Sequence, residues 1–555
     1  MFSIITFKRI CFFAAISFCF ESGAQQPGEV SIGNNAITYY AQRGDTLISI
    51  ANKYTEKSSN WISIGKLNKI ANDRAIPIRT GITIPFNLLR ELLIEAKVIA
   101  YAGQSTVGLD ATSAQPVAVG TVVREGTIIT TSKNGFVTLE LPDNSRISIP
   151  SNSQIKLSKL RATQYANSPK TELTLLAGRV ESTVSSLKAN NGRFEVHSPL
   201  AIAGVRGTHF RVDVSDAHVA NEVLEGNVAV GQTAHPNALS LSAGKGNIID
   251  AKSVGESVDL LAAPKLVGNF ALQERILVKF DAENNALAKS YRAQIALDDK
   301  AQNLIQENLF AEPHFKFSNL DDGNYFLRVT AIDANGLEGL PSVVPFKLKA
   351  HPEPPFNIAP KKKLRAQQVD FSWSEAANAA GYHLQVASDE QFAHLLIDQA
   401  TLSDHQFTTT ELPVGTFFWR VATIATKNGT QDHGPFGDVD KVQLLAPAAG
   451  LPPVTDQGGS EISFSWASEP GQTFILQMSD DTDFKHILIN QKLSAPEYQL
   501  ARPSAGTYYL RVQAIDADGY VGAFSGTQKF TVFSRLMTTD GTPVNSAAGV
   551  VRTNF

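Results

Sequence analysis

The C-terminal half of the sequence repeats itself three times, and this repeat constrains the fold more than any other feature. Segments that begin at Gly323, Gly415 and Gly506 align as GNYFLRVTAI, GTFFWRVATI and GTYYLRVQAI, at intervals of 92 and 91 residues. Trp373 and Trp466, each in the sequence FSW, are 93 residues apart. Periods of about 20 to 50 residues are typical of solenoids, whereas a unit of this length is a whole domain. The sequence therefore predicts three related domains in tandem.

Each copy contains short runs in which apolar and polar residues alternate, and this alternation predicts β-strands. Proline-rich junctions such as HPEPP at residues 351–355 separate the copies, and such junctions stiffen a linker. The copies resemble fibronectin type III domains, which are β-sandwiches. We expect three sandwiches at residues 262–350, 353–446 and 451–533 that act as a spacer, followed by a disordered tail at 534–555.

Length and composition place the chain among multidomain globular proteins. A chain of 555 residues is too long for one hydrophobic core. Hydrophobic residues make up 43% and charged residues 18%, which is typical of folded soluble material and not of a disordered chain. The formal net charge of -4 gives no electrostatic basis for binding nucleic acid.

The N-terminus has the pattern of an export signal. Lys8 and Arg9 precede an apolar run from Ile10 to Phe20, and small residues follow at Ser22 and Ala24. The run is long enough for a signal peptide and too short to span a bilayer, although an uncleaved anchor is the alternative. We expect cleavage after Ala24. Because the two cysteines are Cys11 and Cys19, the mature chain would contain no thiol, no disulfide and no thiolate metal site.

Residues 37–86 have the pattern of a small module with two helices between two strands. Leu47, Ile50, Ala51 and Tyr54 recur at helical spacing directly after Gly44-Asp45-Thr46, a turn followed by a helix cap. A second helix is predicted around Trp61, whose side chain we assign to the core. The segments YYAQRGDTLISIANKY, IGKLNKI and TGITIP together resemble a LysM domain from end to end.

The LysM resemblance implies a shallow groove that binds glycans containing N-acetylglucosamine, such as peptidoglycan. A neutral sugar needs hydrogen-bonding partners and an apolar wall more than it needs charge. An alternative for Asp45 or Thr46 is a purely structural role as the helix cap. The stretch between Ile70 and Thr80 departs from the usual family spacing, so the second wall is the weaker part of the assignment. Carried over by position, the groove residues are Gly44, Asp45, Thr46 and Leu47 on one side and Ile76, Pro77, Ile78 and Arg79 on the other.

Residues 95–253 form a second module of short alternating strands punctuated by glycines, as expected of an all-β domain. The segments LTLLAGRVEST, GRFEVHSPLAIAGVRGTHFRVDV and NEVLEGNVAVG resemble the FecR domain. This resemblance implies a periplasmic β-rich interaction domain that contacts an envelope protein. Within its most distinctive stretch, we expect Arg206 to bind neighbouring carbonyl groups and His209 to be a solvated surface residue.

No sequence pattern of a nucleophile elbow, zinc protease, phosphate loop or dinucleotide site occurs, so we expect no enzymatic activity, no cofactor and no catalytic residue. The Asp-x-Asn/Asp-Gly sequences at Asp333 and Asp516 lack the remaining ligands of a calcium loop, and we interpret them as hairpin turns without metal.

The predicted fold is therefore mainly β and multidomain: a small βααβ LysM module, a β-rich FecR-like domain and three tandem sandwiches. We expect a periplasmic or cell-envelope protein that binds peptidoglycan non-covalently, with no transmembrane span in the mature chain and no nucleic-acid partner. The FecR-like domain and the sandwiches would present surfaces to an envelope partner. Two alternatives remain open from the sequence: a periplasmic signalling component of the FecR type, and a surface adhesin that uses the sandwiches.

Overall fold

A computed structural model gives the architecture of the chain. It describes residues 26–110, 112–166, 168–185, 192–205, 207–215, 218–232, 235–447, 450–456, 459–547 and 549–553. The predicted signal peptide at residues 1–24 and Arg206 lie outside the described residues. The chain divides into two compact units: the first contains residues up to 271, 279–317 and 324–347, and the second contains 272–278, 318–323 and the remainder from 348.

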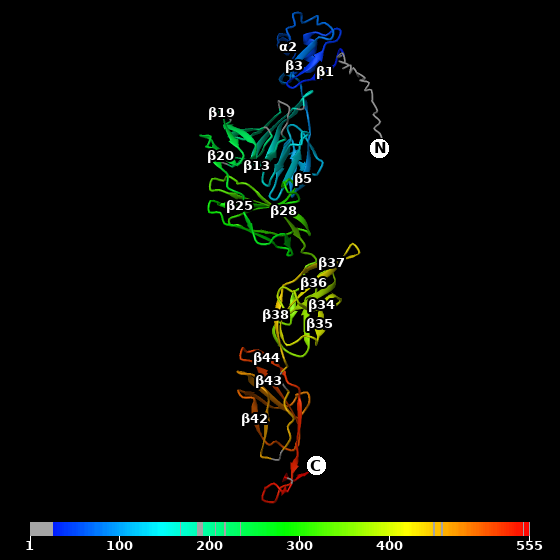
Figure 1. The fold of residues 1–555 in the computed structure, drawn as a ribbon, viewed down its shortest axis with the longest axis vertical. Coiled ribbons are helices and arrows are strands. Elements are labelled where there is room, and N and C mark those ends of the chain that lie inside the picture. The colour runs from blue at the N-terminus through cyan, green and yellow to red at the C-terminus, as the bar shows by residue number, and fades with distance from the viewer. Residues whose placement is uncertain are drawn as a thin grey trace, which may run out of the picture. The chain divides into compact units, whose positions relative to one another are not determined.

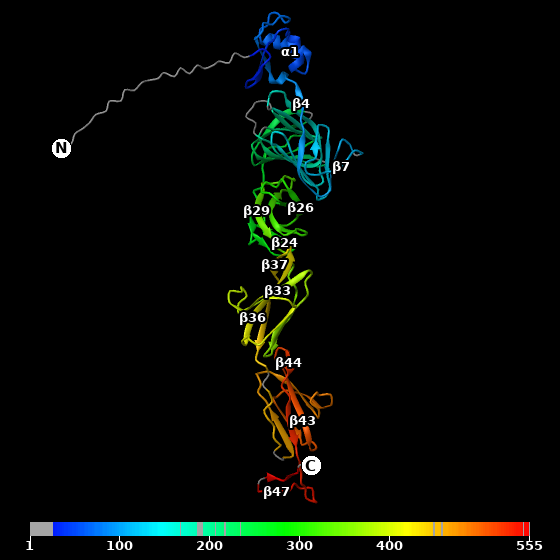
Figure 2. The same ribbon diagram turned by 90° about the vertical axis from the view of Figure 1, so that its right-hand side faces the viewer.

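The first module of unit 1 packs two short helices on a three-stranded antiparallel sheet of order β1-β2-β3 (Figures 1 and 2). The four periodic residues of the first helix, beginning with Leu47, are all buried, which confirms the predicted helical face. Trp61 packs half-buried against this core, whereas Leu67 is exposed. The elements are β1 (Val30–Ile32), β2 (Ala36–Tyr40), α1 (Leu47–Tyr54), α2 (Trp61–Leu67), β3 (Gly81–Pro85) and two 3-10 turns, Ser58–Asn60 and Phe86–Leu88.

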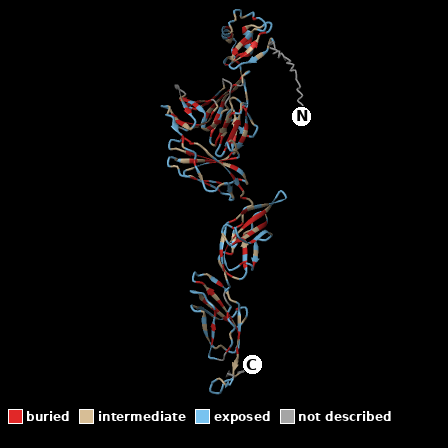
Figure 3. Ribbon diagram, viewed as in Figure 1, coloured by how far each residue is buried: buried red, intermediate tan, exposed pale blue. Residues whose placement is uncertain are grey.

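The second module of unit 1 is an all-β domain whose strands enclose one large apolar core, shown by the buried residues in Figure 3. Its strands are β4 (Glu91–Leu93), β5 (Ala96–Ala102), β6 (Ser105–Gly108), β7 (Gln115–Pro116), β8 (Val122–Val123), β9 (Ile128–Thr131), β10 (Phe136–Glu140), β11 (Arg146–Ile149), β12 (Gln154–Thr163), β13 (Pro169–Thr183), β14 (Arg193–His197), β15 (Ala201–Val205), β16 (His209–Val214), β17 (His218–Glu225), β18 (Asn227–Gln232), β19 (His235–Ser242), β20 (Lys245–Asp250) and β21 (Val258–Asp259).

Strand β13 belongs to both layers of this domain. Its first part pairs with β12 and β14, and its last part pairs with β11 and β16. The change falls at Gly178, which has φ +73°, and a Cβ there would lie 2.4 Å from the carbonyl oxygen of Asn152. Only glycine tolerates both the positive φ and this close approach. Gly178 therefore allows one long strand to connect the two layers.

The first repeat, β22–β29, contains a sheet of order β22-β24-β27 and a facing sheet with the order β29-β28-β25-β26. Phe280, which lies 93 residues before Trp373 and occupies the position of the repeated tryptophan, is buried at 2% exposure. The strands are β22 (Leu266–Val267), β23 (Leu272–Gln273), β24 (Val278–Ala282), β25 (Ser290–Ala296), β26 (Leu304–Phe310), β27 (His314–Phe317), β28 (Gly323–Ile332) and β29 (Ser342–Leu348).

The second repeat, β30–β38, keeps this arrangement in unit 2, with a sheet β30-β32-β35 facing a sheet built on β38-β36-β33-β34. Trp373 and Trp419 are completely buried between its sheets. The strands are β30 (Asn357–Ala359), β31 (Lys362–Arg365), β32 (Val369–Trp373), β33 (Ala379–Ala387), β34 (Leu395–Leu402), β35 (Gln406–Thr409), β36 (Gly415–Lys427), β37 (Thr430–Phe436) and β38 (Asp440–Leu445).

The third repeat, β39–β45, pairs β39 with β42 and opposes them to β41-β40-β43-β44. Strands β46 (Ser534–Arg535), β47 (Asn545–Ser546), β48 (Gly549–Val550) and β49 (Arg552–Thr553) follow, where the sequence predicts no regular structure. The fold class is thus confirmed as mainly β and multidomain. The strands of the third repeat are β39 (Glu461–Ser465), β40 (Thr473–Ser479), β41 (Ile487–Leu493), β42 (Glu497–Ala501), β43 (Gly506–Ile515), β44 (Val521–Phe524) and β45 (Gln528–Val532).

Candidate functional site

The two loops that the sequence assigns to a glycan groove lie against each other in the first module. The backbone N–H of Leu47 donates to the carbonyl oxygen of Asp73 at 2.9 Å, and the N–H of Arg79 donates to the carbonyl oxygen of Ala41 at 2.7 Å. These bonds join the loop that opens α1 to the loop that precedes β3. The structure therefore brings the two predicted walls together, including the stretch between residues 70 and 80.

The polar side chains of the first loop have intramolecular partners. Thr46 is the N-cap of α1, where its hydroxyl accepts from the N–H of Ser49 at 3.1 Å and the Ser49 hydroxyl accepts from the N–H of Thr46 at 2.9 Å. Oδ2 of Asp45 accepts from the Tyr39 hydroxyl at 2.7 Å and from the N–H of Gln42 at 2.8 Å. Thr46 thus supplies the cap, and Asp45 holds the turn in front of it.

The predicted groove residues fall into three classes of exposure. Leu47 and Ile76 are buried in the module core, so their side chains are not accessible to a ligand. Asp45 and Thr46 are half-buried. The exposed members, which offer side chains or an open backbone, are Gly44, Pro77, Ile78 and Arg79.

Each of the two loops contains a residue with a positive φ. Gly44 has φ +90° and nothing within 4 Å of the place where a Cβ would stand, so this turn leaves open space beside the backbone. Arg79 has φ +69° in the opposite loop, and the hydroxyl of Thr80 donates to the carbonyl oxygen of Pro77 at 2.7 Å. Open backbone and the exposed apolar side chains of Pro77 and Ile78 suit a ligand that combines amide groups with apolar faces.

Two tyrosines of the first module have raised pKa values. Burial, followed by the hydrogen bond to Asp45, raises the pKa of Tyr39 above its ordinary value. Burial also raises the pKa of Tyr54 to about 12. Lys53 Nζ lies 5.2 Å from the centroid of the Tyr39 ring and 5.1 Å from that of Tyr54. Both phenols are neutral and belong to the buried core of the module.

The structure corrects the prediction for His209 in the second module. His209 is 22% exposed, and its Nε2 lies 2.6 Å from a carboxylate oxygen of Glu181 on the neighbouring strand β13. It is therefore a half-buried, paired side chain and not a solvated surface residue. The pairing joins positions 28 residues apart, so the local pattern around His209 could not indicate it.

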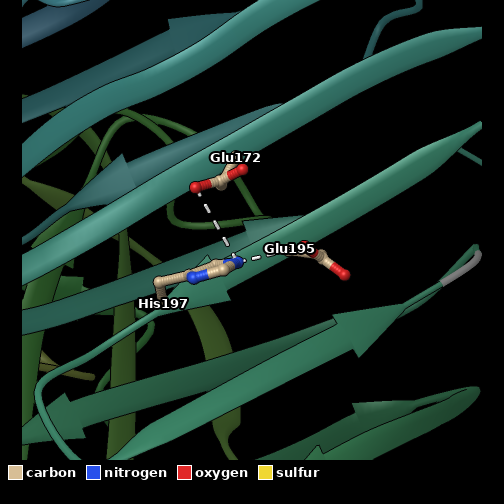
Figure 4. A group of neighbouring side chains, drawn as sticks. All are labelled: Glu172, Glu195 and His197. Atoms are coloured by element: carbon tan, nitrogen blue, oxygen red, sulfur yellow. Dashed lines mark hydrogen bonds and ion pairs between the residues drawn. The ribbon is translucent and has the colours of Figure 1, made fainter. Parts of the chain in front are cut away.

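Glu172, Glu195 and His197 form the one group of three potential metal ligands found among the described residues (Figure 4). Nε2 of His197 lies 3.0 Å from Glu195 and 3.9 Å from Glu172. Arg193 also pairs with Glu195. An open groove of about 630 Å³ is lined by Lys170, Arg193 and Glu195, among other residues. No sequence pattern indicates this group, because its residues come from two strands that meet through the parallel pairing of β13 and β14.

Two family models match the chain. Residues 39–85 match the model of the LysM domain, and residues 127–229 match that of the FecR protein. The chain therefore contains a LysM domain and a FecR domain, as the sequence predicts. These are binding or signalling domains that are typical of cell-envelope proteins. A search of curated proteins found no significant match.

Several solved structures are similar to parts of the chain, each with a TM-score of 0.19. A candidate anti-sigma factor from Parabacteroides distasonis is 19% identical over 24% of this chain, and the match spans 57% of the length of that protein. The FN1–FN3 domains of chicken CNTN1 are 16% identical over 49% of this chain and 98% of theirs. The chicken interferon gamma receptor alpha chain is 13% identical over 32% of this chain and 98% of its own.

Proposed function

We propose that this protein is an exported, non-catalytic component of a bacterial cell envelope that binds peptidoglycan through its LysM domain. The proposal is supported chiefly by the backbone hydrogen bonds that join the two loops. The exposed residues of these joined loops are Gly44, Pro77, Ile78 and Arg79. The ligand is an N-acetylglucosamine-containing glycan, with amide groups that meet open backbone at Gly44. No cofactor or nucleic acid takes part, and the FecR domain provides a surface for an envelope protein.

The position of the chain in the cell follows from the same proposal. Residues 1–24 act as a cleaved signal peptide, so the mature protein begins at Gln25 in the periplasm or at the cell envelope. Among the described residues, no helix has the length and apolarity needed to cross a bilayer. N-terminal sequencing of the protein from a periplasmic or envelope fraction tests cleavage, and a sequence that starts at Met1 would contradict it.

The second and third repeats support a spacer role because polar contacts hold their junction. Arg365 on β31 of the second repeat contacts Glu469 of the third at 2.6 Å and Asp516 at 3.2 Å. Lys363 contacts Asp516 at 2.6 Å. Asp516 lies at the β43–β44 hairpin, as predicted, and its carboxylate serves this junction. Several simultaneous contacts restrict motion at a junction better than one exposed ion pair.

The test is sedimentation of the full mature chain with purified sacculi. Ile78→Ser removes the larger of the two exposed apolar side chains from the groove. Burial of this side chain by a ligand contributes about 1 kcal/mol, so we expect about fivefold weaker binding. Ile62→Ser is the matched control, because Ile62 is on α2 outside both loops and has 59% exposure against 53% for Ile78. Binding of Ile62→Ser should equal that of the unmodified chain.

A chain without residues 26–86 separates the LysM domain from the rest of the protein. We expect it to remain in the supernatant, and N-acetylglucosamine oligomers should release the intact chain from sacculi. Equal sedimentation of the shortened and intact chains would contradict glycan binding by the LysM domain.

A signalling role is the second candidate, favoured by the FecR match at residues 127–229. In that case the FecR domain contacts an inner-membrane or transporter protein. Cross-linking of the intact protein in its envelope, followed by identification of the partner, distinguishes the two. A structural role predicts cross-links to glycan and to an envelope protein that is neither an inner-membrane regulator nor a transporter.

A further inference from the structure

The three repeats place an arginine at the same position of the same strand, and it meets a glutamine on the neighbouring strand. Arg420 donates to Gln385 at 2.8 Å and Arg511 donates to Gln477 at 2.8 Å, while the separation in the first repeat is 3.4 Å. The register is identical, since each arginine lies directly opposite its glutamine: Arg328 and Gln294, Arg420 and Gln385, Arg511 and Gln477.

In the second and third repeats, two phenylalanines cover this arginine. The guanidinium carbon of Arg420 lies 3.9 Å from the ring centroid of Phe392 and 4.2 Å from that of Phe436. Arg511 has the same two distances to Phe484 and Phe524. Stacking of a guanidinium between two rings is favourable and covers both of its planar surfaces. These repeats therefore close this part of the sheet with their own side chains.

In the first repeat, the two phenylalanine positions are occupied by Ala301 and Pro341. Ala301 has φ +53°, close to the +58° of Phe392 and the +55° of Phe484, so the loop conformation is retained while the ring is absent. Ala301 is 3% exposed and belongs to an apolar cluster with Phe136 of the FecR domain. A phenylalanine at position 301 would compete with the ring of Phe136 for this space.

Arg328, left without phenylalanine neighbours, pairs with the FecR domain instead. Its Nη1 lies 2.9 Å from Glu181 on β13, and the same carboxylate contacts His209. Burial alone would raise the pKa of Glu181, but Arg328 and His209 hold it well below its usual range. Glu181 is therefore ionised and fully compensated in this position.

Glu338 is a further difference between the repeats, since register places His433 in the second repeat and Val521 in the third at its position. Its carboxylate contacts Arg211 of β16 at 3.0 Å and Arg179 of β13 at 2.5 Å, both from the FecR domain. Within the first repeat it contacts Arg292 at 2.9 Å and accepts from Thr330 at 2.7 Å.

The backbone and the remaining carboxyl groups complete these contacts. Arg211 donates to the carbonyl oxygens of Glu338 at 2.5 Å and Gly339 at 2.8 Å. Glu222 of β17 accepts from the N–H of Glu338 at 3.0 Å. Glu307 of the first repeat contacts Arg292 at 3.0 Å and accepts from the Ser151 hydroxyl of the FecR domain at 2.9 Å. Burial of charges is costly unless each is paired, and here every group has a partner.

The junction between the FecR domain and the first repeat contains eight ionisable groups at 13% side-chain exposure or less, four of each kind. Burial raises the pKa of the Glu222 carboxyl to about 7, and the less buried Asp213 contacts Arg179 at 3.5 Å. The four guanidinium groups are Arg179, Arg211, Arg292 and Arg328, and the four carboxyl groups are Glu181, Glu222, Glu307 and Glu338. Half of each set comes from the FecR domain and half from the first repeat. We call the surface formed by β13, β16 and β17 the FecR face. The complementary charges indicate that the first repeat is the domain that binds this face.

We propose that the first repeat is a dedicated docking partner of this FecR face, specialised by Ala301, Pro341 and Glu338, and that the two act as one unit. The face is consequently closed to any other protein, and an envelope partner of the FecR domain must bind elsewhere on it. This inference is independent of glycan binding by the LysM domain.

Thiol labelling tests the docking in the full mature chain. Cys11 and Cys19 are the only cysteines, so a chain that begins at Gln25 carries Ala301→Cys as its single thiol. The substitution is small and lies inside the junction. We expect this thiol to react at least about a hundredfold more slowly than the same thiol in urea, because it reacts only when the junction opens.

Two substitutions from opposite sides of the junction should accelerate the reaction about tenfold or more. Glu338→Val installs the residue of the third repeat, and Arg179→Met removes its partner on the FecR side. Phe484→Ala is the matched control in the third repeat and should leave the rate unchanged. Circular dichroism identifies a variant that fails to fold, in which case the other variant decides. Rapid labelling of the unmodified junction, or rates unaffected by either substitution, would overturn the proposal.

Discussion

Replacement of Asp45 by asparagine separates a structural role of this residue from a role in ligand binding. One oxygen of Asp45 accepts from Tyr39 and from the N–H of Gln42. An asparagine oxygen can occupy the same place, but both bonds then lose their ionic character. Hydrogen bonds to charged groups contribute about 1 kcal/mol more than neutral ones. Because the carboxylate is half-exposed and partly screened, we expect a total loss of about 1 to 2 kcal/mol.

Hydrogen exchange of the α1 amides in the full chain measures this loss locally. A loss of 1 to 2 kcal/mol corresponds to exchange that is faster by about 5- to 30-fold. Asp73→Asn is the control in the facing loop, because the contribution of Asp73 to the loop junction is its backbone carbonyl. Binding to sacculi in the cold should survive Asp45→Asn. Unchanged exchange together with lost binding would refute the structural role and place Asp45 at the ligand.

Three further predictions concern stability. The pKa values of Glu181 and Glu338 lie below the unfolded value near 4.5, so their stabilising contribution is complete above that pH and is lost as the pH falls, which urea unfolding at pH 4 and pH 2 should show as a decreasing midpoint. Gly178→Ala should unfold the FecR domain or cost about 3 kcal/mol or more, because it combines a clash with a positive φ, against about 1 kcal/mol for Gly244→Ala, whose Cβ meets nothing within 4 Å; calorimetry compares them. Trp373→Ala should destabilise the second repeat by about 3 to 5 kcal/mol in denaturant unfolding.

Local patterns were sufficient to predict the modules and the helical face of α1. Leu47 and Tyr54 are buried because a 3.6-residue period determines which side of a helix meets the sheet, and this period is visible in the sequence. The same sequence left the roles of Asp45 and Thr46 open, since both are good cap residues. The choice depends on Tyr39, whose hydroxyl reaches Asp45 only after β2 has packed beside the loop.

The FecR face could not be predicted, because its partners are distant in the sequence. Glu338 and Arg211 are 127 residues apart, and neither belongs to a local motif. Differences between the repeats are the one sequence feature that indicates this contact. Ala301 and Glu338 stand where Phe484 and Val521 stand in the third repeat, so the first repeat lacks a ring that covers the arginine and carries a charge in place of an apolar side chain.

The differences between the repeats also bear on how many of them can act as a spacer. Replacing a buried ion pair by apolar residues often leaves stability unchanged. A gain in stability therefore does not explain why charged groups occupy the junction between the FecR domain and the first repeat. Their effect is selectivity, because a guanidinium or carboxyl group without its partner in a buried junction costs several kcal/mol. The second and third repeats, which carry Phe392 and Phe484 over their arginines, cannot present this pattern to the FecR face. Only the first repeat fits it, and two repeats instead of three therefore remain for the spacer.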